Sequence, residues 1–372
     1  MRVALAGVGR MGSAILGRLR AAGHRVALYD PALPAGESAP SLAGAARRSV
    51  VTFLCLPDAA AVEASLAGLR EAAPPIVVDL TSSLPSTTRR MAGALAPLGV
   101  DFVDCPLSGG VAGARAGTLT AMAGGDRDVL ERVRPVLATF ASNVRWAGPL
   151  GSGHATKALN NALSSVSLAG TAEMLVTGVA HGLDEAEVVA AFNRGTARSQ
   201  NSEVKYPRDV LPRTYAAGFT TALMVKDLGI ALAIARERAV PVRFLSGVLE
   251  TWEEALTAMG PDADFTRIHA LIDSRSTGEG RPAPAGVEVL SHALAAMNLL
   301  AATEAMRVAG AEGLDRERVL GILNTSTGRS EATRSGLAGT VDASALVAAR
   351  DLARAAGVWA PLTALAAALA AG

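Results

Sequence analysis

The first thirty residues place the strongest restriction on the fold. Residues 2–30 read RVALAGVGRMGSAILGRLRAAGHRVALYD, which fits a strand, a tight glycine turn, an amphipathic helix and a second strand that ends in an acid. In such a start Gly7 permits the tight turn, Gly9 lets the backbone approach a pyrophosphate, and Gly12 lets the helix pack against the strand. Because the glycines stand between a strand and a helix and Asp30 follows at the expected distance, we predict a dinucleotide-binding fold.

Asp30 also bears on which dinucleotide binds. A carboxylate at the end of the second strand accepts hydrogen bonds from a ribose hydroxyl and repels a 2′-phosphate. Pro31 follows at the place where an arginine would clamp that phosphate. We therefore expect NAD rather than NADP, with one alternative left open: Asp30 only opens the turn DPALPAG.

Further β-type runs follow in the first 150 residues: SVVTFLCLP, PIVVDL and GVDFVDCPL. They alternate with helical stretches, which is typical of an α/β Rossmann-type, doubly wound parallel sheet. The loops that follow the strands of such a sheet form its binding site. The residues expected around the nicotinamide are therefore Leu56, Pro57, Ser82 and the loop after Cys105.

That last loop, residues 104–125, is rich in glycine: DCPLSGGVAGARAGTLTAMAGG. Glycines leave backbone N–H groups free to approach a ligand, and Ser108 adds a hydroxyl, so the loop is suited to bind an anion. A glycine-rich hairpin turn fits the same composition.

A long apolar helix with one polar stripe is predicted next, within residues 148–182. Lys157 and Asn161 are four residues apart and therefore project from one face, with Asn160 and Ser164 beside them. Burial weakens the preference of a lysine for its charged form, which suits it to exchange a proton with a reacting hydroxyl. The alternative is a lysine near the helix start whose ammonium group extends into water.

Five motifs occur together in the order of a known family, and they cover roughly residues 1–275: GVGRMG at 7–12, DLTSSLP at 79–85, DCPLSGGVAGARAGTLT at 104–120, GSGHATKALNN at 151–161 and GFTTALMVKDL at 218–228. In these motifs the chain resembles the β-hydroxyacid dehydrogenase family. The resemblance implies an NAD(P)-dependent oxidoreductase that transfers a hydride between a nicotinamide and a small 3-hydroxy acid or its semialdehyde.

The resemblance also implies a role for individual residues. Lys157 is the general acid and base, and Asn161 orients the substrate or the lysine. The substrate carboxylate is held by Ser108, Gly109 and Gly110, and Lys226 closes over the cofactor. The other residues expected to line the cofactor are Arg10, Met11, Leu56 and Ser82, the last a serine where many relatives have threonine.

One stretch of the chain is repeated. Residues 180–199, AHGLDEAEVVAAFNRGTARS, recur as residues 311–330, AEGLDRERVLGILNTSTGRS, at an offset of 131. At this offset Glu173 matches Glu304, but the positions of Lys157 and Asn161 are taken by Glu288 and His292. The second copy thus keeps the helix-packing pattern and loses the chemistry. We interpret Glu288 and His292 as surface residues rather than metal ligands, because no third ligand is visible.

These features predict a division into four parts. Residues 1–150 form the NAD(P)-binding domain, 151–273 the helical catalytic domain, 274–285 a linker rich in Gly, Pro and Ser, and 286–372 the degenerate second helical copy. We expect the second copy to pack on the first and to occupy part of the surface that relatives give to a partner subunit. A homodimer and a monomer are both left open.

Composition excludes several other classes of protein. A net charge of +1 and 3% aromatic residues argue against a nucleic-acid partner.

Cys55 and Cys105 lie in apolar stretches and are expected to be buried free thiols. The C-terminal run VWAPLTALAAALAAG contains Pro361 and is expected to be a buried packing helix rather than a membrane span. Since the chain opens directly on a strand, we expect a cytoplasmic protein.

Three rival functions remain on this architecture. A decarboxylating enzyme similar to 6-phosphogluconate dehydrogenase needs an acid one turn beyond the asparagine, where this chain has Ser164. Imine reductases generally lack the lysine that Lys157 supplies. A catalytically idle nucleotide-binding protein is disfavoured by Lys157, Asn161 and the Ser-Gly-Gly loop.

Overall fold

The computed structural model describes residues 1–34, 36–277 and 286–371. They form two compact units, one of residues 1–158 with 312–322, and one of 159–311 with the chain from 323 onward. This grouping separates the sheet from the helical part and does not divide the helical part at the predicted linker. Of that linker, residues 278–285 lie outside the described residues, and the predicted domain boundaries remain predictions.

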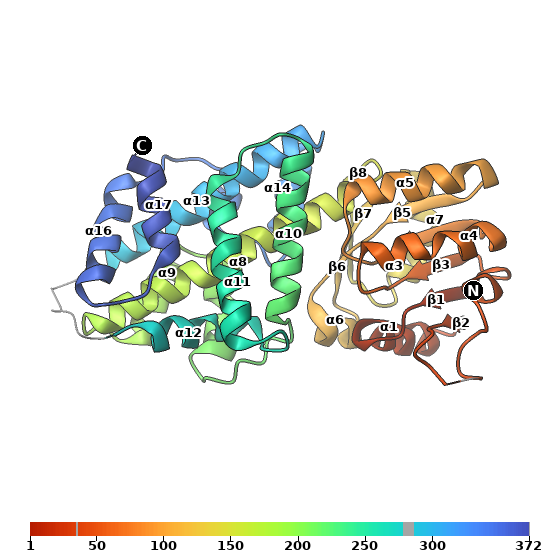
Figure 1. The fold of residues 1–372 in the computed structure, drawn as a ribbon, viewed down its shortest axis with the longest axis horizontal. Coiled ribbons are helices and arrows are strands. Elements are labelled where there is room, and N and C mark those ends of the chain that lie inside the picture. Colours follow the sequence, from red (N-terminus) through yellow and green to blue (C-terminus); the bar gives the residue numbers. More distant parts are fainter. Residues whose placement is uncertain (35, 278–285, 372) are drawn as a thin grey trace. The chain divides into compact units, whose positions relative to one another are not determined.

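The first unit is built on the expected parallel sheet (Figure 1). Its first five strands are parallel and lie in the order β2-β1-β3-β4-β5. Every residue of β3 and β4 is buried, as expected for strands covered on both faces. The strands are β1 (Arg2–Ala6), β2 (Arg25–Tyr29), β3 (Val51–Leu54), β4 (Ile76–Asp79) and β5 (Asp101–Asp104).

The far edge of the sheet departs from the parallel pattern. There β7 (Thr120–Gly124) runs antiparallel to β5 and to β6 (Leu107–Ser108), and parallel to β8 (Asn143–Gly148). The glycine-rich segment between β6 and β7 is not a simple hairpin turn, because it contains helix α6 (Gly110–Ala116). This helix is too short to carry a parallel crossover, so the chain returns antiparallel.

Helices cover both faces of the sheet and bury a core on each. Phe53 belongs to the core on one face and Leu54 to the core on the other, since neighbouring strand residues point to opposite sides. The helices that pack here are α1 (Arg10–Ala21), α2 (Leu42–Ala46), α3 (Ala59–Ala64), α4 (Leu66–Ala72), α5 (Pro85–Leu95) with the short 3₁₀ helix η1 (Ala96–Leu98), and α7 (Arg127–Leu137).

A piece of the second copy belongs to this unit. Ile322, in α14 (Arg316–Leu323), packs with buried residues of β7 and β8. Arg318 lies 4.4 Å from the ring centre of Trp146. Glu312 accepts a hydrogen bond of 2.7 Å from Arg89. Residues 312–322 therefore stabilise the sheet unit rather than the helical one.

The second unit is helical and is built around α8 (Ser152–Ala180), which begins in the first unit, and α13 (Val287–Ala311). Both are long and apolar enough to cross a membrane, but 94% and 72% of their most apolar windows are buried, as in core helices. The remaining elements are α9 (Glu185–Arg194), the π-helix η2 (Asn201–Val210), α10 (Thr221–Glu237), α11 (Arg243–Met259), η3 (Phe265–Arg267), α12 (Ile268–Arg275), α15 (Glu331–Arg334), α16 (Ala343–Ala355) and α17 (Pro361–Ala371).

The two copies of the repeat meet through matching residues. Ser199 and Ser330, which are equivalent at the offset of 131, face each other in an antiparallel bridge. The N–H of Gln200 donates to the carbonyl of Arg329, and the N–H of Glu331 donates to the carbonyl of Arg198. Equivalent residues that pair with each other are the mark of a local two-fold relation.

Two buried glutamates at equivalent positions of the two copies show the same two-fold relation. Glu173 accepts hydrogen bonds from the N–H groups of Leu362 and Thr363, at the start of α17. Its equivalent, Glu304, accepts them from Phe244 and Leu245, at the start of α11. Each copy thus caps a helix of the other copy. The buried residues of α17 confirm the C-terminal run as a packing helix.

Candidate active site

The glycine turn after β1 has the geometry that its sequence predicts. A Cβ on Gly7, whose φ is +89°, would lie 2.2 Å from the carbonyl oxygen of Cys55, and a Cβ on Gly12 would lie 2.1 Å from that of Gly7. Packing within the chain therefore excludes larger residues at both positions. A Cβ on Gly9 would meet no atom of the described residues within 4 Å. Unlike Gly7 and Gly12, Gly9 is therefore not required by a close contact within the chain, and it leaves open space beside the backbone.

This open space lies at the start of α1. Gly9 is the N-cap residue and makes no side-chain capping hydrogen bond, and the first turn of α1 contains no acid. The N-terminal N–H groups of a helix and its dipole favour an anion at this place. The turn and the helix start fit the pyrophosphate of a dinucleotide.

The Asp30 carboxylate opens the turn after β2, which is the role given above as the alternative to binding a ribose hydroxyl. Its Oδ1 accepts from the N–H of Ala32, 2.9 Å away, and so opens the turn after β2. Its Oδ2 accepts from the N–H of Val8, 2.7 Å away, within the glycine turn. The charge is thereby fixed beside the turn, and each oxygen keeps a lone pair for a ribose hydroxyl.

The other predicted cofactor residues follow strands at the same edge of the sheet. Arg10 and Met11 form the first turn of α1. The loop of Leu56 and Pro57 follows β3, the loop of Ser82 follows β4, and the N–H of Leu56 ties the two by donating to Thr81 Oγ1 at 3.1 Å. Because β1, β3 and β4 are parallel, their carboxyl ends share this edge.

The start of α8 is fixed to this edge by a buried carboxylate. Asp104, the last residue of β5, accepts hydrogen bonds from the N–H of Gly151 at 2.7 Å and of His154 at 2.8 Å. The approach is so close that a Cβ on Gly153 would lie 2.2 Å from the carbonyl oxygen of Met122. The glycines of the GSGH motif thus serve packing, and they let the helix begin directly at the sheet.

His154 completes this anchor. Its Nδ1 lies 2.7 Å from Thr88 Oγ1, and its Nε2 lies 3.9 Å from Asp79 Oδ2. Burial raises the pKa of Asp79, and the nearby imidazole opposes that shift. Two acids at the ends of neighbouring strands, Asp79 and Asp104, therefore share one buried histidine in the first turn of α8.

Lys157 stands one turn further along α8. Only 7% of the residue is exposed, so Lys157 is buried rather than a surface lysine. The sequence alternative of an extended surface lysine is wrong for this chain.

Asn161 lies one turn beyond Lys157 and is 4% exposed. Its Nδ2 donates to Asp227 Oδ2, and its Oδ1 accepts from Asn160 Nδ2 at 2.9 Å. The other oxygen of Asp227 lies 3.8 Å from Lys226 Nζ and is buried without a hydrogen-bond partner among the residues that the structure describes. Sequence reasoning missed Asp227, although it stands beside Lys226 in the motif GFTTALMVKDL.

The predicted carboxylate-binding residues stand at the start of α6. Ser108 ends β6 and is buried, and Gly109 and Gly110 have φ of +123° and +65°. These positive φ values favour glycine, and they turn the chain from the strand into α6. The backbone conformation, rather than only the composition, therefore explains this pair of glycines.

Residues 201–210 form the π-helix η2, which is held by buried polar side chains. Lys205 Nζ donates to Asn201 Oδ1, and Asn201 Nδ2 donates to Ser167 Oγ on α8. These contacts across the sequence explain why the local pattern did not reveal the helix.

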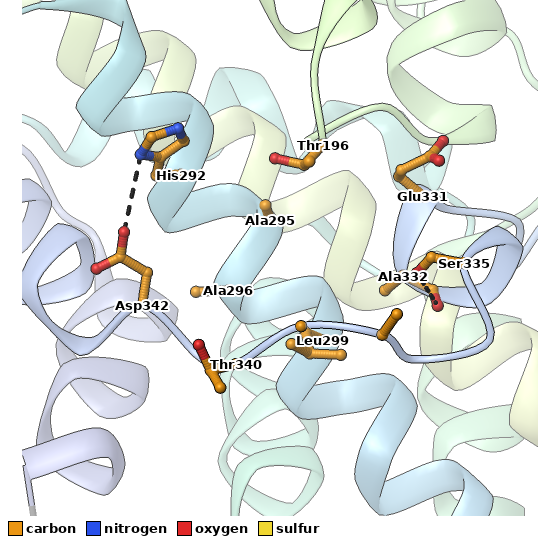
Figure 2. A pocket seen from close by; sticks show the side chains of 12 residues that line it. Thr196, His292, Ala295, Ala296, Leu299, Glu331, Ala332, Ser335, Thr340 and Asp342 are labelled. Atoms are coloured by element: carbon orange, nitrogen blue, oxygen red, sulfur yellow. Dashed lines mark hydrogen bonds and ion pairs between the residues drawn. The ribbon is translucent and has the colours of Figure 1, made fainter.

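The second-copy counterparts of the site residues face water. Glu288 is exposed, and the His292 side chain is 59% exposed with Nδ1 3.7 Å from Asp342 Oδ2. His292 and Thr196 lie at a surface cavity of about 320 Å³ (Figure 2). The interpretation of Glu288 and His292 as surface residues agrees with these positions.

The two thiols are not suited to nucleophilic chemistry. Burial raises the pKa of Cys55 to about 12 and raises the pKa of Cys105 further. Both therefore stay protonated near neutral pH.

Comparisons with known proteins agree with this geometry. Residues 2–148 match the family described as the NAD binding domain of 6-phosphogluconate dehydrogenase, and residues 151–272 match the one described as NAD-binding of NADP-dependent 3-hydroxyisobutyrate dehydrogenase. A 3-hydroxyisobutyrate dehydrogenase of Pseudomonas aeruginosa is 34% identical over 72% of this chain and 97% of its own length. A 2-hydroxy-3-oxopropionate reductase of Escherichia coli is 32% identical over 73% and 97%.

Solved structures extend the likeness to the fold. The 3-hydroxyisobutyrate dehydrogenase of Mycobacterium tuberculosis with L-serine covers 73% of this chain and 98% of its own, with a TM-score of 0.69 at 28% identity. The 6-phosphogluconate dehydrogenase of Plasmodium falciparum covers 99% of this chain and 92% of its own, with a TM-score of 0.69 at 15% identity, so it shares the fold including the second helical copy. The chain belongs to the β-hydroxyacid dehydrogenase family, and its fold carries a second copy of the helical part.

Proposed function

We propose that this protein transfers a hydride between a nicotinamide cofactor and a small 3-hydroxy acid or its semialdehyde, with Lys157 as the general acid and base. One observation carries the proposal. Lys157 is buried on a helix whose start is fixed by Asp104 to the sheet edge that bears the glycine turn. The names of the Pseudomonas and Escherichia relatives support the same class of substrate.

The use of lysine in the whole chain supports this role. The chain holds only three lysines, at positions 157, 205 and 226, among 35 lysine and arginine residues. An arginine stays protonated at any ordinary pH, whereas burial brings a lysine within reach of deprotonation. Lys157 is one of the three positions at which this chain carries a lysine, and a lysine there suits a group that must release its proton.

The residues of this chain divide the reaction between them. In the direction of oxidation, Lys157 Nζ takes the proton of the substrate hydroxyl, and in reduction it returns that proton. Asn161 orients the reacting groups, while Ser108 and the N–H groups of Gly109 and Gly110 hold the carboxylate. A bound nicotinamide would supply the acceptor for the hydride of the substrate carbon.

We propose NAD as the preferred cofactor. The Asp30 carboxylate is held beside the glycine turn by two hydrogen bonds. Its charge repels a 2′-phosphate and favours a ribose hydroxyl.

A decarboxylating reaction is the second candidate, because the fold likeness to 6-phosphogluconate dehydrogenase spans nearly the whole chain. The position one turn beyond Asn161 nevertheless holds a serine, Ser164, which is 3% exposed. A serine hydroxyl is a much weaker acid than a carboxyl group and cannot replace it in protonating an enediol. The dehydrogenase without decarboxylation is therefore preferred.

We also propose that the pairing of the two copies replaces a partner subunit. The bridge at Ser199 and Ser330 joins equivalent residues, as a two-fold interface between subunits does. The helical part then needs no partner subunit, and the protein would act as a monomer. We propose the cytoplasm as its location.

A substrate panel tests the proposal. We expect the purified protein to be monomeric by light scattering. We also expect it to reduce NAD with at least one of 3-hydroxyisobutyrate, L-serine or glycerate. The ratio kcat/KM should be at least about tenfold higher with NAD than with NADP, and Asp30→Ala should reduce that preference. Release of CO₂ from 6-phosphogluconate would establish the decarboxylating function instead. Tight NAD binding without any turnover would contradict the proposal and favour an idle binding protein.

A further inference from the structure

A loop of the second copy contacts the helix that carries the proposed chemistry. The loop is residues 324–330, NTSTGRS, and it reaches Asn160 on α8 through two hydrogen bonds. Thr327 Oγ1 accepts from Asn160 Nδ2 at 2.7 Å, and the N–H of Gly328 donates to Asn160 Oδ1 at 2.8 Å. Asn160 is fully buried, so these contacts are shielded from water.

The contacts continue from Asn160 to the site itself. Asn160 Nδ2 also donates to Asn161 Oδ1, and Asn161 Nδ2 donates to Asp227 Oδ2. A backbone N–H only donates and a carboxylate only accepts, so Gly328 at one end and Asp227 at the other fix which way each carboxamide faces. The loop of the second copy is thereby linked to Asn161 through Asn160.

The two copies differ at the residues that make these contacts. A Cβ on Gly328 would lie 2.6 Å from the carbonyl oxygen of Asn160, so only glycine fits there. At the offset of 131 the first copy has Ala197 in this place, and its Thr196 is exposed and lines the same cavity as His292 (Figure 2). The counterpart of Asn160 is Ser291, whose hydroxyl donates to its own helix at Val287. The network therefore exists on one side of the local two-fold relation.

The loop is itself held firmly in place. Asn324 Nδ2 donates to the carbonyl of Thr333 at 3.2 Å, and Arg329 pairs with Glu203 at 2.6 Å. The bridge at Ser330 adds a backbone link to the first copy. A loop fixed at both ends is suited to hold a side chain in one orientation.

We infer that Thr327 and Gly328 are positioning residues, which act through Asn160 to hold Asn161 in its working orientation. This inference rests on the proposed function of Asn161. The second copy then does more than stabilise the fold, because the site on the first copy is incomplete without its loop. Thr327 and Gly328 do not act on the substrate themselves.

Kinetics of matched variants test the inference. Thr327→Val removes the hydroxyl and leaves one buried N–H of Asn160 without its acceptor. We expect kcat to fall about tenfold while KM for NAD stays within about twofold. Thr327→Ser keeps the hydroxyl and should restore kcat. The control is Thr196→Val, the same change at the equivalent exposed position, which should leave kcat unchanged.

A second readout does not depend on activity. The chain has only seven asparagines, at positions 143, 160, 161, 193, 201, 298 and 324, so ¹⁵N-asparagine labelling gives a small set of side-chain amide signals. We expect the Asn160 and Asn161 signals to shift and to exchange faster with water in Thr327→Val, and to stay unchanged in Thr196→Val. This readout applies even if the wild type turns over no member of the substrate panel, which would overturn only the proposed function.

Two results would overturn the inference. The first is a Thr327→Val protein whose Asn160 and Asn161 signals match the wild type. The second is an equal loss of kcat in Thr327→Val and Thr196→Val, since that would reflect a general structural effect. Gly328→Ala gives a further check, because its Cβ has to displace the loop from Asn160 and should lower kcat more than Thr327→Val does.

Discussion

The two copies of the repeat share a fold and differ in the side chains at the positions of Lys157 and Asn161. Glu173 and Glu304 cap helices in the same way, and Asn193 and Asn324 each donate to a carbonyl nine residues on. The position of Lys157, however, holds a glutamate in the second copy. Contacts that build the fold occur in both copies, whereas the proposed catalytic lysine stands in one copy.

The difference teaches that the second copy is not simply a faded version of the first. Its loop has a glycine at position 328, where the first copy has Ala197, and this glycine is what permits contact with Asn160. Loss of chemistry on its own helix is thus accompanied by a specific contact to the other helix. The copies have become complementary rather than equivalent.

The largest effect is expected at the anchor that fixes the start of α8 in the first copy. Asp104→Ala removes a buried carboxylate that accepts two backbone hydrogen bonds at the start of α8. We expect the free energy of unfolding to fall by about 4 kcal/mol and kcat to fall with it, because Lys157 follows on the same helix. Chemical denaturation and steady-state kinetics measure both.

The second copy supplies the matched control for this anchor. Asp342 caps α16 by accepting from the N–H of Ala345, but its side chain is 42% exposed. Asp342→Ala should cost only about 1 kcal/mol and leave kcat unchanged. Equal losses of kcat in the two variants would show that the anchor has no special relation to the site.

A smaller effect, dependent on pH, is expected at the shared glutamate of the first copy. Burial raises the pKa of Glu173 to about 7 from 4.5, and hydrogen bonds from Thr363 and the backbone oppose the shift. Since the folded pKa is the higher one, the folded protein binds more protons than the unfolded chain between these values. The contribution of Glu173 to stability is therefore fully present below pH 4.5 and is lost as the pH rises to 7, by about 3 kcal/mol.

Glu173→Gln cannot ionise and should lack this part of the pH dependence. Urea denaturation of both proteins between pH 4.5 and 8 measures the difference. The difference between wild type and variant should change with pH up to about 7 and be constant above it. A difference that is independent of pH over the whole range would show that Glu173 is ionised throughout in the folded state.

Patterns that are local in sequence predicted much of the molecule. The alternation of strands and helices gave the Rossmann-type sheet, and the spacing of Gly7, Gly9 and Gly12 gave the turn that the structure shows. The four-residue spacing of Lys157 and Asn161 placed both on one helix. The offset of 131 revealed the second copy.

Contacts between distant residues were not predictable in this way. Asp104 reaches Gly151 across 47 residues, and Asn160 reaches Thr327 across 167. The π-helix at 201–210 also depends on contacts of Asn201 to α8. A repeat shows which residues are equivalent, but which copy's loop lies against which helix is decided by packing.

The most direct test compares Lys157→Ala with Glu288→Ala, the same change at equivalent positions of the two copies. Turnover of a hydroxy acid should fall at least about a hundredfold in Lys157→Ala and recover in part when ethylamine or propylamine is added, while the Kd for NAD stays the same. Glu288→Ala should match the wild type and not respond to amines. Full activity of Lys157→Ala, or an equal loss in Glu288→Ala, would contradict a single active site on the first copy.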